Sequence, residues 1–333
     1  MLLLWKHLVG VFVAARHADG WLDACVRFIG AARAVFTYRK HRELLALEIV
    51  DKYVSDDGQG DALFHISHRH YLSTELSFRE RIDCALTHYR YEGQSYTAAY
   101  KEAVYHHQGL TLWSRRVDSR RYALVLRATT DLRHEGGISV VLLADGHCLN
   151  EMSFAWVPGE LLGLDRDVVP FITRNQSAHH DTAPVVQFRQ DFPQNSPSYF
   201  CLAAMHGIAE ANGKPHLAGI RHDCQIAFDE RYASSFRSSY CDFWKSFGGV
   251  EQCRQAYLMP VPLVPPPLSS VKAKHRGRAI ERRRHWSEIS SGAAAIAALY
   301  VRDRKNRNAG AGAHVLHHLM PHLSTLMSLA MVF

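Results

Sequence analysis

Five side chains in the sequence are of types that can transfer a proton or carry a reacting group. They are one imidazole, two carboxylates and two hydroxyls: His88, Glu135, Asp242, Ser153 and Tyr240. A neutral histidine, or a carboxylate of raised pKa, can remove the proton from an amine during acyl transfer. We therefore treat the set as candidate catalytic residues, on the condition that folding brings them together.

Each of these residues also has a structural interpretation. His88 could bond a neighbour on a half-buried helix face, and Glu135 could be a solvated turn residue before two glycines. Asp242 could pair with Lys245. Tyr240 belongs to an aromatic series at helical spacing, and such a series usually packs in a core. The series is Tyr240, Phe243, Trp244 and Phe247.

The segment 187–197 is a second candidate site because it precedes a well-marked helix. Ser196 can cap this helix, Pro197 suits its first position, and Asn212-Gly213 supplies a left-handed stop. The start of a helix leaves backbone N–H groups free to hold a phosphate. The predicted cofactor-binding residues are Gln187, Arg189, Asn195, Ser196 and Ser198. The segment lacks the glycines that let a backbone wrap a phosphate, so an ordinary capped helix is the alternative.

Metal binding is not predicted. The histidine clusters His65/His68/His70 and His314/His318/His322 have no carboxylate or thiolate close by in sequence, and Pro321 interrupts the helix that would carry the second. The seven cysteines are scattered without a C-x-x-C pair, which argues against structural zinc and favours reduced thiols. A disulfide in an exported form of the protein is the alternative.

The elements that must position these residues follow from hydrophobic spacing and turn signals. Residues 1–60 and about 77–106 are predicted to be helical, and Ser77 with Glu80 forms a capping box. An antiparallel meander is then expected, with its strongest hairpin signal at Asp145-Gly146. Its strands are predicted over 110–117, 122–129, 137–144, 148–157, 168–173 and 185–188. The helix from Pro197 then leads to a strand over 216–220 as a β-α-β crossover.

The C-terminal part is predicted to change character twice. A helix is expected over about 234–247, and the proline-rich segment 260–270 can be neither helix nor central strand. We divide the chain into an N-terminal helical region (1–60), an α+β core (61–260), a proline-rich connector (261–271), a basic helix (272–290) and a tail (291–333) that could be disordered.

The positive charge is concentrated near the C-terminus. The 333 residues carry a formal net charge of +7, and 47% of them are apolar, which excludes a disordered chain. From Lys272 to Arg307 there are 11 Lys/Arg and three acids, a net +8, which leaves 7 − 8 = −1 elsewhere. The segment Lys272–Arg284 could contact an anionic membrane surface or an envelope-related protein, and a solvated helix is the alternative. Few aromatics interrupt it, so specific nucleic-acid binding is not expected.

The N-terminus does not have the order of a secretory signal. Leu2 to Trp5 precede the first basic residue, Lys6, and the apolar core that follows is short. We predict an amphipathic first helix instead, with a noncleaved or atypical export signal as the alternative. No run of about 18 apolar residues suggests a transmembrane helix, so we expect a cytoplasmic protein, at most peripheral to the inner membrane.

Several segments in this order resemble the VirK/YbjX family of bacterial proteins, a domain of unknown function. They are Tyr71-Leu72, the helix from Arg81 to His88-Tyr89, the Asp-Gly hairpin ending in Ser153-Phe154, and the run from Tyr240-Cys-Asp-Phe-Trp through Gly248-Gly249 to Tyr257-Leu-Met-Pro260. The resemblance covers about residues 20–285. It implies a bacterial factor connected with virulence, tolerance of host antimicrobial peptides and envelope properties, without an established reaction. Gln176-Ser177 and Ser196-Pro197 depart from the Gln-Gly and Arg-Pro of the family pattern.

The predicted order of meander, loop, helix and strand also resembles the arrangement of acyl-CoA N-acyltransferases (GNAT-like proteins). That resemblance implies acyl-CoA as cofactor and a groove beside 187–197 faced by Ser153 or Tyr240. We predict an α+β fold with N-terminal helices, a mostly antiparallel mixed sheet with one crossover, and a C-terminal basic helix. Two functions stay open: a VirK-like envelope factor acting through protein or lipid contacts, and an N-acyltransferase acting on an envelope component or protein.

Overall fold

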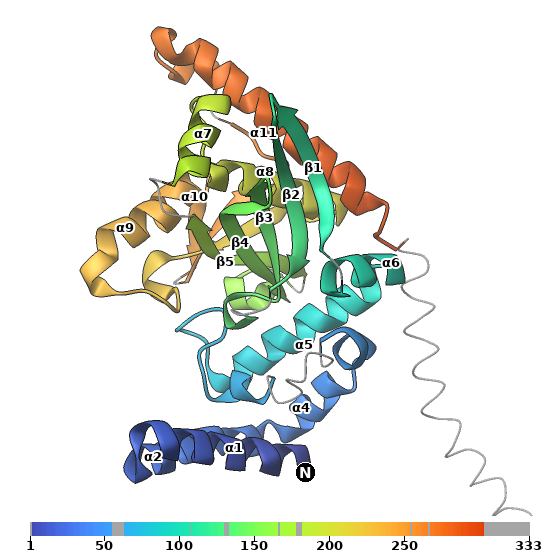
Figure 1. Cartoon of the computed structure of the whole chain (residues 1–333), viewed down its shortest axis with the longest axis vertical. Coiled ribbons are helices and arrows are strands. Elements are labelled where there is room, and N and C mark those ends of the chain that lie inside the picture. The colour runs from blue at the N-terminus through green and yellow to red at the C-terminus, as the bar shows by residue number, and fades with distance from the viewer. Residues whose placement is uncertain are drawn as a thin grey trace, which may run out of the picture.

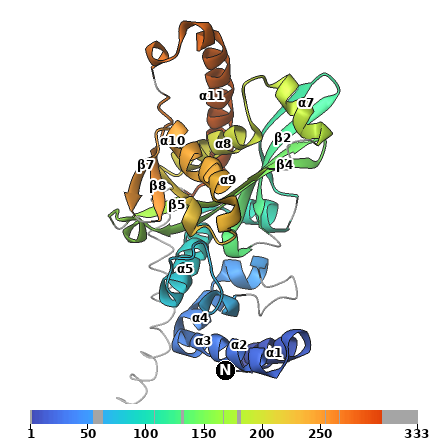
Figure 2. The same ribbon diagram turned by 90° about the vertical axis from the view of Figure 1, so that its left-hand side faces the viewer.

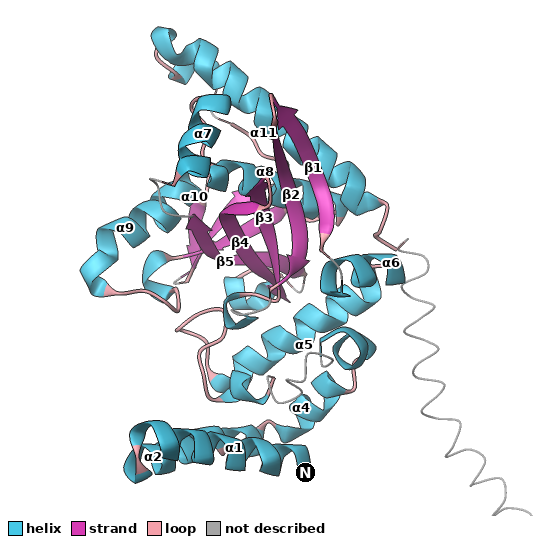
Figure 3. Ribbon diagram, in the orientation of Figure 1, coloured by secondary structure: helices cyan, strands magenta, loops and turns pink. Residues whose placement is uncertain are grey.

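The computed structural model describes residues 2–54, 63–106, 108–129, 133–165, 167–177, 182–253, 255–265 and 267–302. Within these ranges the chain has the predicted α+β fold, in which one eight-stranded sheet lies between two groups of helices (Figures 1 and 3). The first helices lie at one end of the long axis, and the start of the last helix lies at the other.

The sheet has the strand order β1-β2-β3-β4-β5-β6-β8-β7, and only β5 and β6 pair in parallel. The predicted meander of consecutive strands is confirmed for β1 to β5. At the predicted hairpin, Asp145 and Gly146 have φ angles of +47° and +85°, as a type I′ turn requires. The strands are β1 (Leu110–Val117), β2 (Arg120–Ala128), β3 (Ile138–Ala144), β4 (His147–Pro158), β5 (Val168–Ser177), β6 (His216–Ile220), β7 (Val250–Cys253) and β8 (Ala256–Pro260).

The strand predicted over 185–188 is wrong, because these residues belong to helix α7 (Ala183–Asp191). Pro184 occupies the first turn of α7, where a missing N–H costs nothing. Val185 and Phe188, three positions apart, are the buried residues of this helix. A run of four mostly apolar residues fits a strand and one turn of helix equally well. Here Pro184 and the three-residue interval between the buried Val185 and Phe188 favour the helix. The parallel strand that precedes the crossover is therefore β5.

Two groups of helices cover the faces of the sheet (Figure 2). One face carries α8 (Pro197–Ala211), which packs on β2 to β6, and α11 (Arg276–Ala298), which packs along α8 and on β1. The other face carries α5 (Phe78–Ser95), which packs on β4. The predicted capping box opens α5, since the Ser77 N–H donates to Glu80 Oε2 at 2.8 Å and the Glu80 N–H donates to Ser77 Oγ at 3.3 Å.

The N-terminal helices form a layer beyond α5. They are α1 (Leu2–Asp19), α2 (Trp21–Ala31), α3 (Arg33–Phe36) and α4 (Tyr38–Leu45), followed by short turns η1 (Val50–Val54) and η2 (Phe64–Ser67). Leu4, Leu8, Ala31, Ala34 and Phe64 form a small core of their own, apart from the main core. The second predicted helical block breaks after α5 and continues as α6 (Ala98–Lys101) and η3 (Glu102–His106). No helix in the described part of the chain is long and apolar enough to cross a bilayer.

The C-terminal helix extends further than predicted. Helix α11 runs to Ala298, so the predicted boundary after residue 290 falls inside it. Trp286, Ile289 and Ala293 on this helix belong to the main core. The predicted helix over 234–247 is present as α9 (Ala233–Arg237), the π-helical turn η8 (Ser238–Asp242) and α10 (Phe243–Ser246). Residues 303–333, most of the predicted tail, lie outside the described residues.

Candidate functional site

The central feature of the candidate site is the end of pairing between the two parallel strands. Strand β6 pairs with β5 only at Phe171/Ala218 and Ile172/Gly219, and β6 ends at Ile220. Strand β5 continues for five more residues, 173–177, and there it pairs only with β4 among the strands. The backbone on the opposite edge of this stretch is therefore available to other partners.

A tryptophan fixes the helical segment that takes the place of β6 at this edge. Trp244 is fully buried and lies on β6 where Gly219 leaves room, since a Cβ there would come within 2.5 Å of the indole. Its Nε1–H donates to the Ile220 carbonyl at 2.8 Å. The aromatic series at 240–247 therefore packs in the core. The same packing holds η8 beside β5.

Tyr240 on η8 meets the free edge of β5. The backbone N–H of Asn175 donates to the Tyr240 hydroxyl at 3.3 Å, and the Asn175 side chain donates to the Ser239 carbonyl at 3.1 Å. Tyr240 is buried, and this burial raises the pKa of its phenol. The phenol is therefore protonated at neutral pH. As the acceptor from Asn175, the hydroxyl keeps its own hydrogen for another partner.

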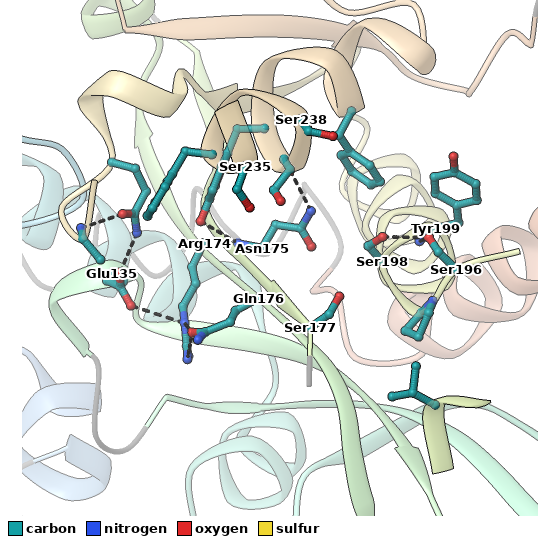
Figure 4. A pocket seen from close by; sticks show the side chains of 18 of the residues that line it. Glu135, Arg174, Asn175, Gln176, Ser177, Ser196, Ser198, Tyr199, Ser235 and Ser238 are labelled. Atoms are coloured by element: carbon teal, nitrogen blue, oxygen red, sulfur yellow. Dashed lines mark hydrogen bonds and ion pairs between the residues drawn. The ribbon is translucent and has the colours of Figure 1, made fainter. Parts of the chain in front are cut away.

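A cavity of about 680 Å³ opens beside this contact. Figure 4 shows Glu135 and Arg174 at one end, Ser196 and Ser198 at the other, and Asn175 between them. Its walls come from β5, from the start of α8 and from the segment Ser234–Tyr240, and they are rich in hydroxyl groups. The lining serines are Ser177, Ser196, Ser198, Ser234, Ser235, Ser238 and Ser239.

One end of the cavity is formed by the start of α8. Ser196 caps the helix by accepting the Tyr199 N–H at 3.3 Å, and its hydroxyl lies 2.8 Å from the Ser198 hydroxyl. Arg189 of α7 also lines the cavity. The start of α8 is thus an ordinary serine cap that faces a cavity together with one cationic side chain.

Two of the predicted cofactor-binding residues point elsewhere. Gln187 donates to Asp191 Oδ1 at 2.8 Å within α7. Asn195 is buried, and its side chain joins the loop before α8 to α11. Its Oδ1 accepts the Trp286 Nε1–H at 3.1 Å, and its Nδ2 lies 3.3 Å from His285 Nδ1. Asn195 therefore positions the start of α8 without lining the cavity.

A cluster of charged and amide groups forms the other end. Glu135 is buried, with one carboxylate oxygen 2.5 Å from Gln225 Nε2 and the other 3.3 Å from Arg174 Nε. Arg174 also approaches Glu151 Oε2 at 3.2 Å through Nη1 and Gln176 Oε1 at 2.6 Å through Nη2. These contacts hold a carboxylate and a guanidinium at the cavity wall.

The structure brings Glu135 and Tyr240 to one cavity, but it does not bring His88, Ser153 or Asp242 to its wall. Ser153 is fully buried and bonds the Ser139 hydroxyl at 2.8 Å. Asp242 is exposed on η8. Of the two residues that the resemblance placed at a groove, Ser153 and Tyr240, only Tyr240 lines this cavity.

His88 lies in the core on the α5 side of the sheet. Its Nδ1 accepts the Trp156 backbone N–H at 3.3 Å, and burial lowers the pKa of the imidazole to about 3. The ring is therefore neutral with its proton on Nε2. Its bond to β4 matches the structural interpretation of a helix-face histidine.

Sequence spacing does not indicate the cavity residues Arg174, Asn175 and Gln225. Arg174 and Asn175 lie just past the predicted end of their strand at 173, whereas β5 continues to Ser177. Gln225 follows a short 3-10 turn and carries no motif. The four serines between residues 234 and 239 are the local sequence feature that coincides with the cavity wall.

The fold and site define an α+β protein with a polar cavity at the junction of its parallel strands. Residues 32–164 match the model of a family described as a protein of unknown function, DUF535, which is the VirK/YbjX family. The match spans less than half of the chain, and it is consistent with the resemblance that the motifs indicate. The matched segment includes Glu135 but ends before β5 and α8. No curated protein and no solved structure matches the chain.

The described residues contain no group of three or more His, Cys, Asp or Glu side chains that could hold a metal ion. The cluster His314/His318/His322 lies outside them.

Proposed function

We propose that this protein is an acyl-CoA-dependent N-acyltransferase that acts on an envelope component or a protein. The observation that carries the proposal is the free edge of β5 at Asn175, with the buried Tyr240 on one side and the start of α8 on the other. The order of an antiparallel meander, a crossover helix and one parallel pair is also that of GNAT-like acyltransferases. That likeness is an argument by fold analogy alone.

The middle of the cavity has the groups that a thioester needs. Acyl-CoA would supply an activated acyl group there. The Asn175 N–H, now donating to Tyr240, is a donor to which an acyl carbonyl oxygen could bind. The Tyr240 hydroxyl would then be released from this bond and could donate its proton to the departing sulfur.

The end of the cavity at the start of α8 offers fewer groups to the phosphates of acyl-CoA than the middle offers to its thioester. Arg189 and the Ser198 hydroxyl offer a positive charge and a donor. The Ser196 side chain, however, already occupies the Tyr199 N–H, one of the first-turn groups that a phosphate would use. We infer that the pantetheine and acyl parts of the cofactor would contribute more to binding than the pyrophosphate.

The Glu135 end is the proposed acceptor side. A carboxylate at the cavity wall can attract an ammonium group and accept the proton that an amine loses when it is acylated. Arg174, 3.3 Å away, balances this charge when no amine is present. The pair favours a primary amine as the acyl acceptor.

Binding of CoA thioesters tests the proposal directly. We expect acetyl-CoA and a long-chain acyl-CoA to raise the melting temperature saturably, and calorimetric titration to give one site per chain. Arg189→Glu is expected to weaken binding of both thioesters. A flat thermal response to every CoA thioester up to millimolar concentration would overturn the proposal.

Turnover is tested by release of free CoA in the presence of primary amines, with ethanolamine lipids, polyamines and lysine peptides as acceptors. Tyr240→Phe should bind acyl-CoA but lose roughly 100-fold or more in transfer rate, as expected for a missing general acid. Tyr232→Phe is the matched control, since Tyr232 is an exposed tyrosine outside the cavity. Equal loss in both variants would argue against a role for Tyr240.

We also propose the biological roles that the family resemblance implies, namely support of virulence, tolerance of host antimicrobial peptides and maintenance of envelope properties. Acylation of an amine on an envelope component would remove a positive charge and add apolar surface. In a bacterial host that lacks its own member of the family, wild-type protein should restore survival against a cationic peptide, and Tyr240→Phe should not. Restoration by both proteins would separate the biological role from catalysis.

For the basic segment Lys272–Arg284, we propose contact with an anionic partner of the envelope, such as an acidic protein surface. Lys272, Lys274, Arg276, Arg278 and Arg284 are exposed at the start of α11. Charge reversal at Arg276 and Arg278 should abolish a salt-sensitive interaction and leave acyl-CoA binding intact. Loss of acyl-CoA binding in that variant would assign the segment to the cavity instead.

A further inference from the structure

The N-terminal helices expose an unusual amount of apolar surface. Nine of the fifteen large apolar side chains that are exposed in the described structure belong to α1, α2 and α3. On α1 they include Trp5, Val9 and Val13, which follow one side of the helix at intervals of four residues. A monomeric protein in water rarely exposes so many neighbouring apolar groups without a binding role.

Helix α2 presents its apolar side to the outside. Leu22, Val26 and Ile29 lie at helical spacing and are 85%, 67% and 70% exposed. The side of α2 toward the molecule carries the small buried residues Ala24 and Ala31 instead. An amphipathic helix normally packs its apolar stripe on the core. This reversed orientation leaves the apolar stripe accessible to a partner outside the fold.

The stripe continues past α2 and is bordered by aromatic and basic residues. Phe36 at the end of α3 is 80% exposed. Trp21 is 60% exposed at the turn between α1 and α2, and the Arg16 guanidinium lies 4.5 Å from the centre of its ring. Tryptophan and arginine side by side are typical of residues at the boundary between lipid head groups and acyl chains.

We propose that α1, α2 and α3 form a membrane-docking face that lies on a lipid surface containing anionic head groups. We call the exposed residues Trp5, Val9, Leu22, Val26, Ile29 and Phe36 the N-terminal apolar face. Helix α2 carries its large apolar side chains on one side, as is typical of helices that lie in the plane of the interface. The apolar side chains enter the head-group and acyl boundary, and the basic residues contact lipid phosphates.

Charge favours a lipid surface over a second copy of the chain. From residue 2 to residue 36 there are four Lys/Arg, at 6, 16, 27 and 33, and two Asp, at 19 and 23. Lys6, Arg16, Arg27 and Arg33 are exposed. A dimer through this face would bring two positive surfaces together, whereas anionic lipids would neutralise them.

The proposed face is separate from the basic start of α11. The two lie at opposite ends of the long axis in both views (Figures 1 and 2), so one flat membrane cannot contact both. The start of α11 has charge but little exposed apolar surface, with Ile280 as its one exposed large apolar side chain. Apolar area is what holds an interfacial helix in place, so the N-terminal end is the one that docks.

Vesicle flotation of the full chain tests the proposal. We expect binding to vesicles of phosphatidylethanolamine with phosphatidylglycerol, and much weaker binding to phosphatidylcholine alone. The double variant Leu22→Glu/Ile29→Glu should reduce partitioning at least tenfold, because each charge would enter an apolar layer. Both side chains are exposed, so the fold should be kept, which circular dichroism checks. Ile280→Glu, an equally simple change at the opposite end, should bind as the wild type does.

A site-specific probe reads out the docking face itself. Cys25 is exposed on α2 among the apolar residues, and Cys148 is exposed at the β3–β4 hairpin. An environment-sensitive fluorophore on Cys25, with the other accessible cysteines changed to serine, should shift to the blue when vesicles are added. The same fluorophore on Cys148 should not shift, and raised salt should weaken binding without removing the shift of bound protein.

Three results would overturn the proposal. The first is equal flotation of wild-type protein and Leu22→Glu/Ile29→Glu. The second is a fluorophore shift at Cys148 but not at Cys25. The third is a concentration-dependent dimer that Leu22→Glu/Ile29→Glu abolishes in the absence of lipid, which would assign the face to a second copy of the chain. None of these results depends on whether the cavity binds acyl-CoA.

Discussion

The Tyr240 hydroxyl accepts a hydrogen bond from the backbone N–H of Asn175 at the point where β5 has lost its parallel neighbour. The tyrosine thus replaces the backbone acceptor that a continuing β6 would have offered to β5. The contact satisfies a buried donor in the free protein, and it can be given up without breaking a strand pair. It therefore combines a structural role with availability to a ligand.

Tyr240→Phe should cost roughly 1–3 kcal/mol of unfolding free energy, because it leaves the Asn175 N–H buried without a partner. Urea unfolding measures this cost, and Tyr232→Phe, at an exposed site, should be near neutral. If a thioester carbonyl takes the freed N–H, saturating acetyl-CoA should stabilise Tyr240→Phe more than it stabilises the wild type. Equal stabilisation would mean that the cofactor does not reach Asn175.

The close contact between α8 and α11 gives a second prediction. At Gly207 of α8, an added Cβ would lie 2.2 Å from the Ser290 carbonyl oxygen and 2.8 Å from Ala293 Cβ. Gly207→Ala should therefore push α11 away, at a cost of roughly 1–3 kcal/mol or more. Thermal unfolding measures the loss.

Gly277→Ala is the matched control, because Gly277 also lies in a helix and a Cβ there would meet nothing within 4 Å. Removing a glycine from an open helical position should stabilise by roughly 0.5 kcal/mol. A Gly207→Ala variant as stable as Gly277→Ala would show that α11 does not pack tightly on α8 in solution.

Local signals in the sequence predicted the parts of the fold that local chemistry determines. The Asp145-Gly146 hairpin, the Ser77–Glu80 capping box and the helix from Pro197 are confirmed because each depends on a few adjacent residues. Residues 185–188 of α7 were predicted to be a strand, because a run of four residues fits both the strand period and the helix period. Strand β7 is largely exposed and only four residues long, so it has no hydrophobic pattern to detect.

The candidate site depended on contacts between distant segments, and few of those are visible in sequence. The cavity joins residues near 135, 175, 197, 225 and 240, which only the folded sheet brings together. Tyr240 and Glu135 were selected by residue type and do line it. His88 and Ser153 were selected on the same grounds and are core residues, since a polar type by itself does not tell which face of a sheet it occupies.

Glu92 lies on α5, on the face of the sheet opposite α8, and its burial leads us to predict that the stability of the protein depends on pH. This fully buried carboxylate accepts the Trp156 indole N–H at 2.6 Å, and burial raises its pKa from 4.5 to about 7. The unfolded chain therefore releases this proton at lower pH than the folded protein does. The stability that Glu92 contributes is fully present below pH 4.5 and is lost as the pH rises through about 7.

Glu92→Gln removes this titration and keeps an oxygen that can accept from Trp156. Relative to the wild type, the variant should gain roughly 2 kcal/mol of stability between pH 5 and pH 8. Urea unfolding at both pH values measures the change. A constant difference between the two proteins would show that Glu92 does not titrate in this range, which would indicate that water reaches it.

The buried histidines predict the opposite dependence at lower pH. His206 lies within α8 between the sheet and α11, and neither ring nitrogen has a hydrogen-bond partner in the described structure. Burial lowers its pKa from 6.5 to about 4, and the pKa of His41 is lowered to about 4 by burial and then by His7 and His68. As the pH falls, the unfolded chain binds these protons at a higher pH than the folded protein does. The stability that the neutral histidines contribute is therefore fully present above pH 6.5 and is lost as the pH drops toward about 4.

His206→Leu should reduce that fall, since an apolar side chain of similar size carries no proton. Between pH 7.5 and pH 5 the wild type should lose roughly 2 kcal/mol more than the variant does. His147→Gln, at an exposed position of the hairpin, should keep the wild-type slope. Unfolding curves across this range measure the slopes, and an unchanged slope in His206→Leu would mean that His206 is hydrated or charged in the folded protein.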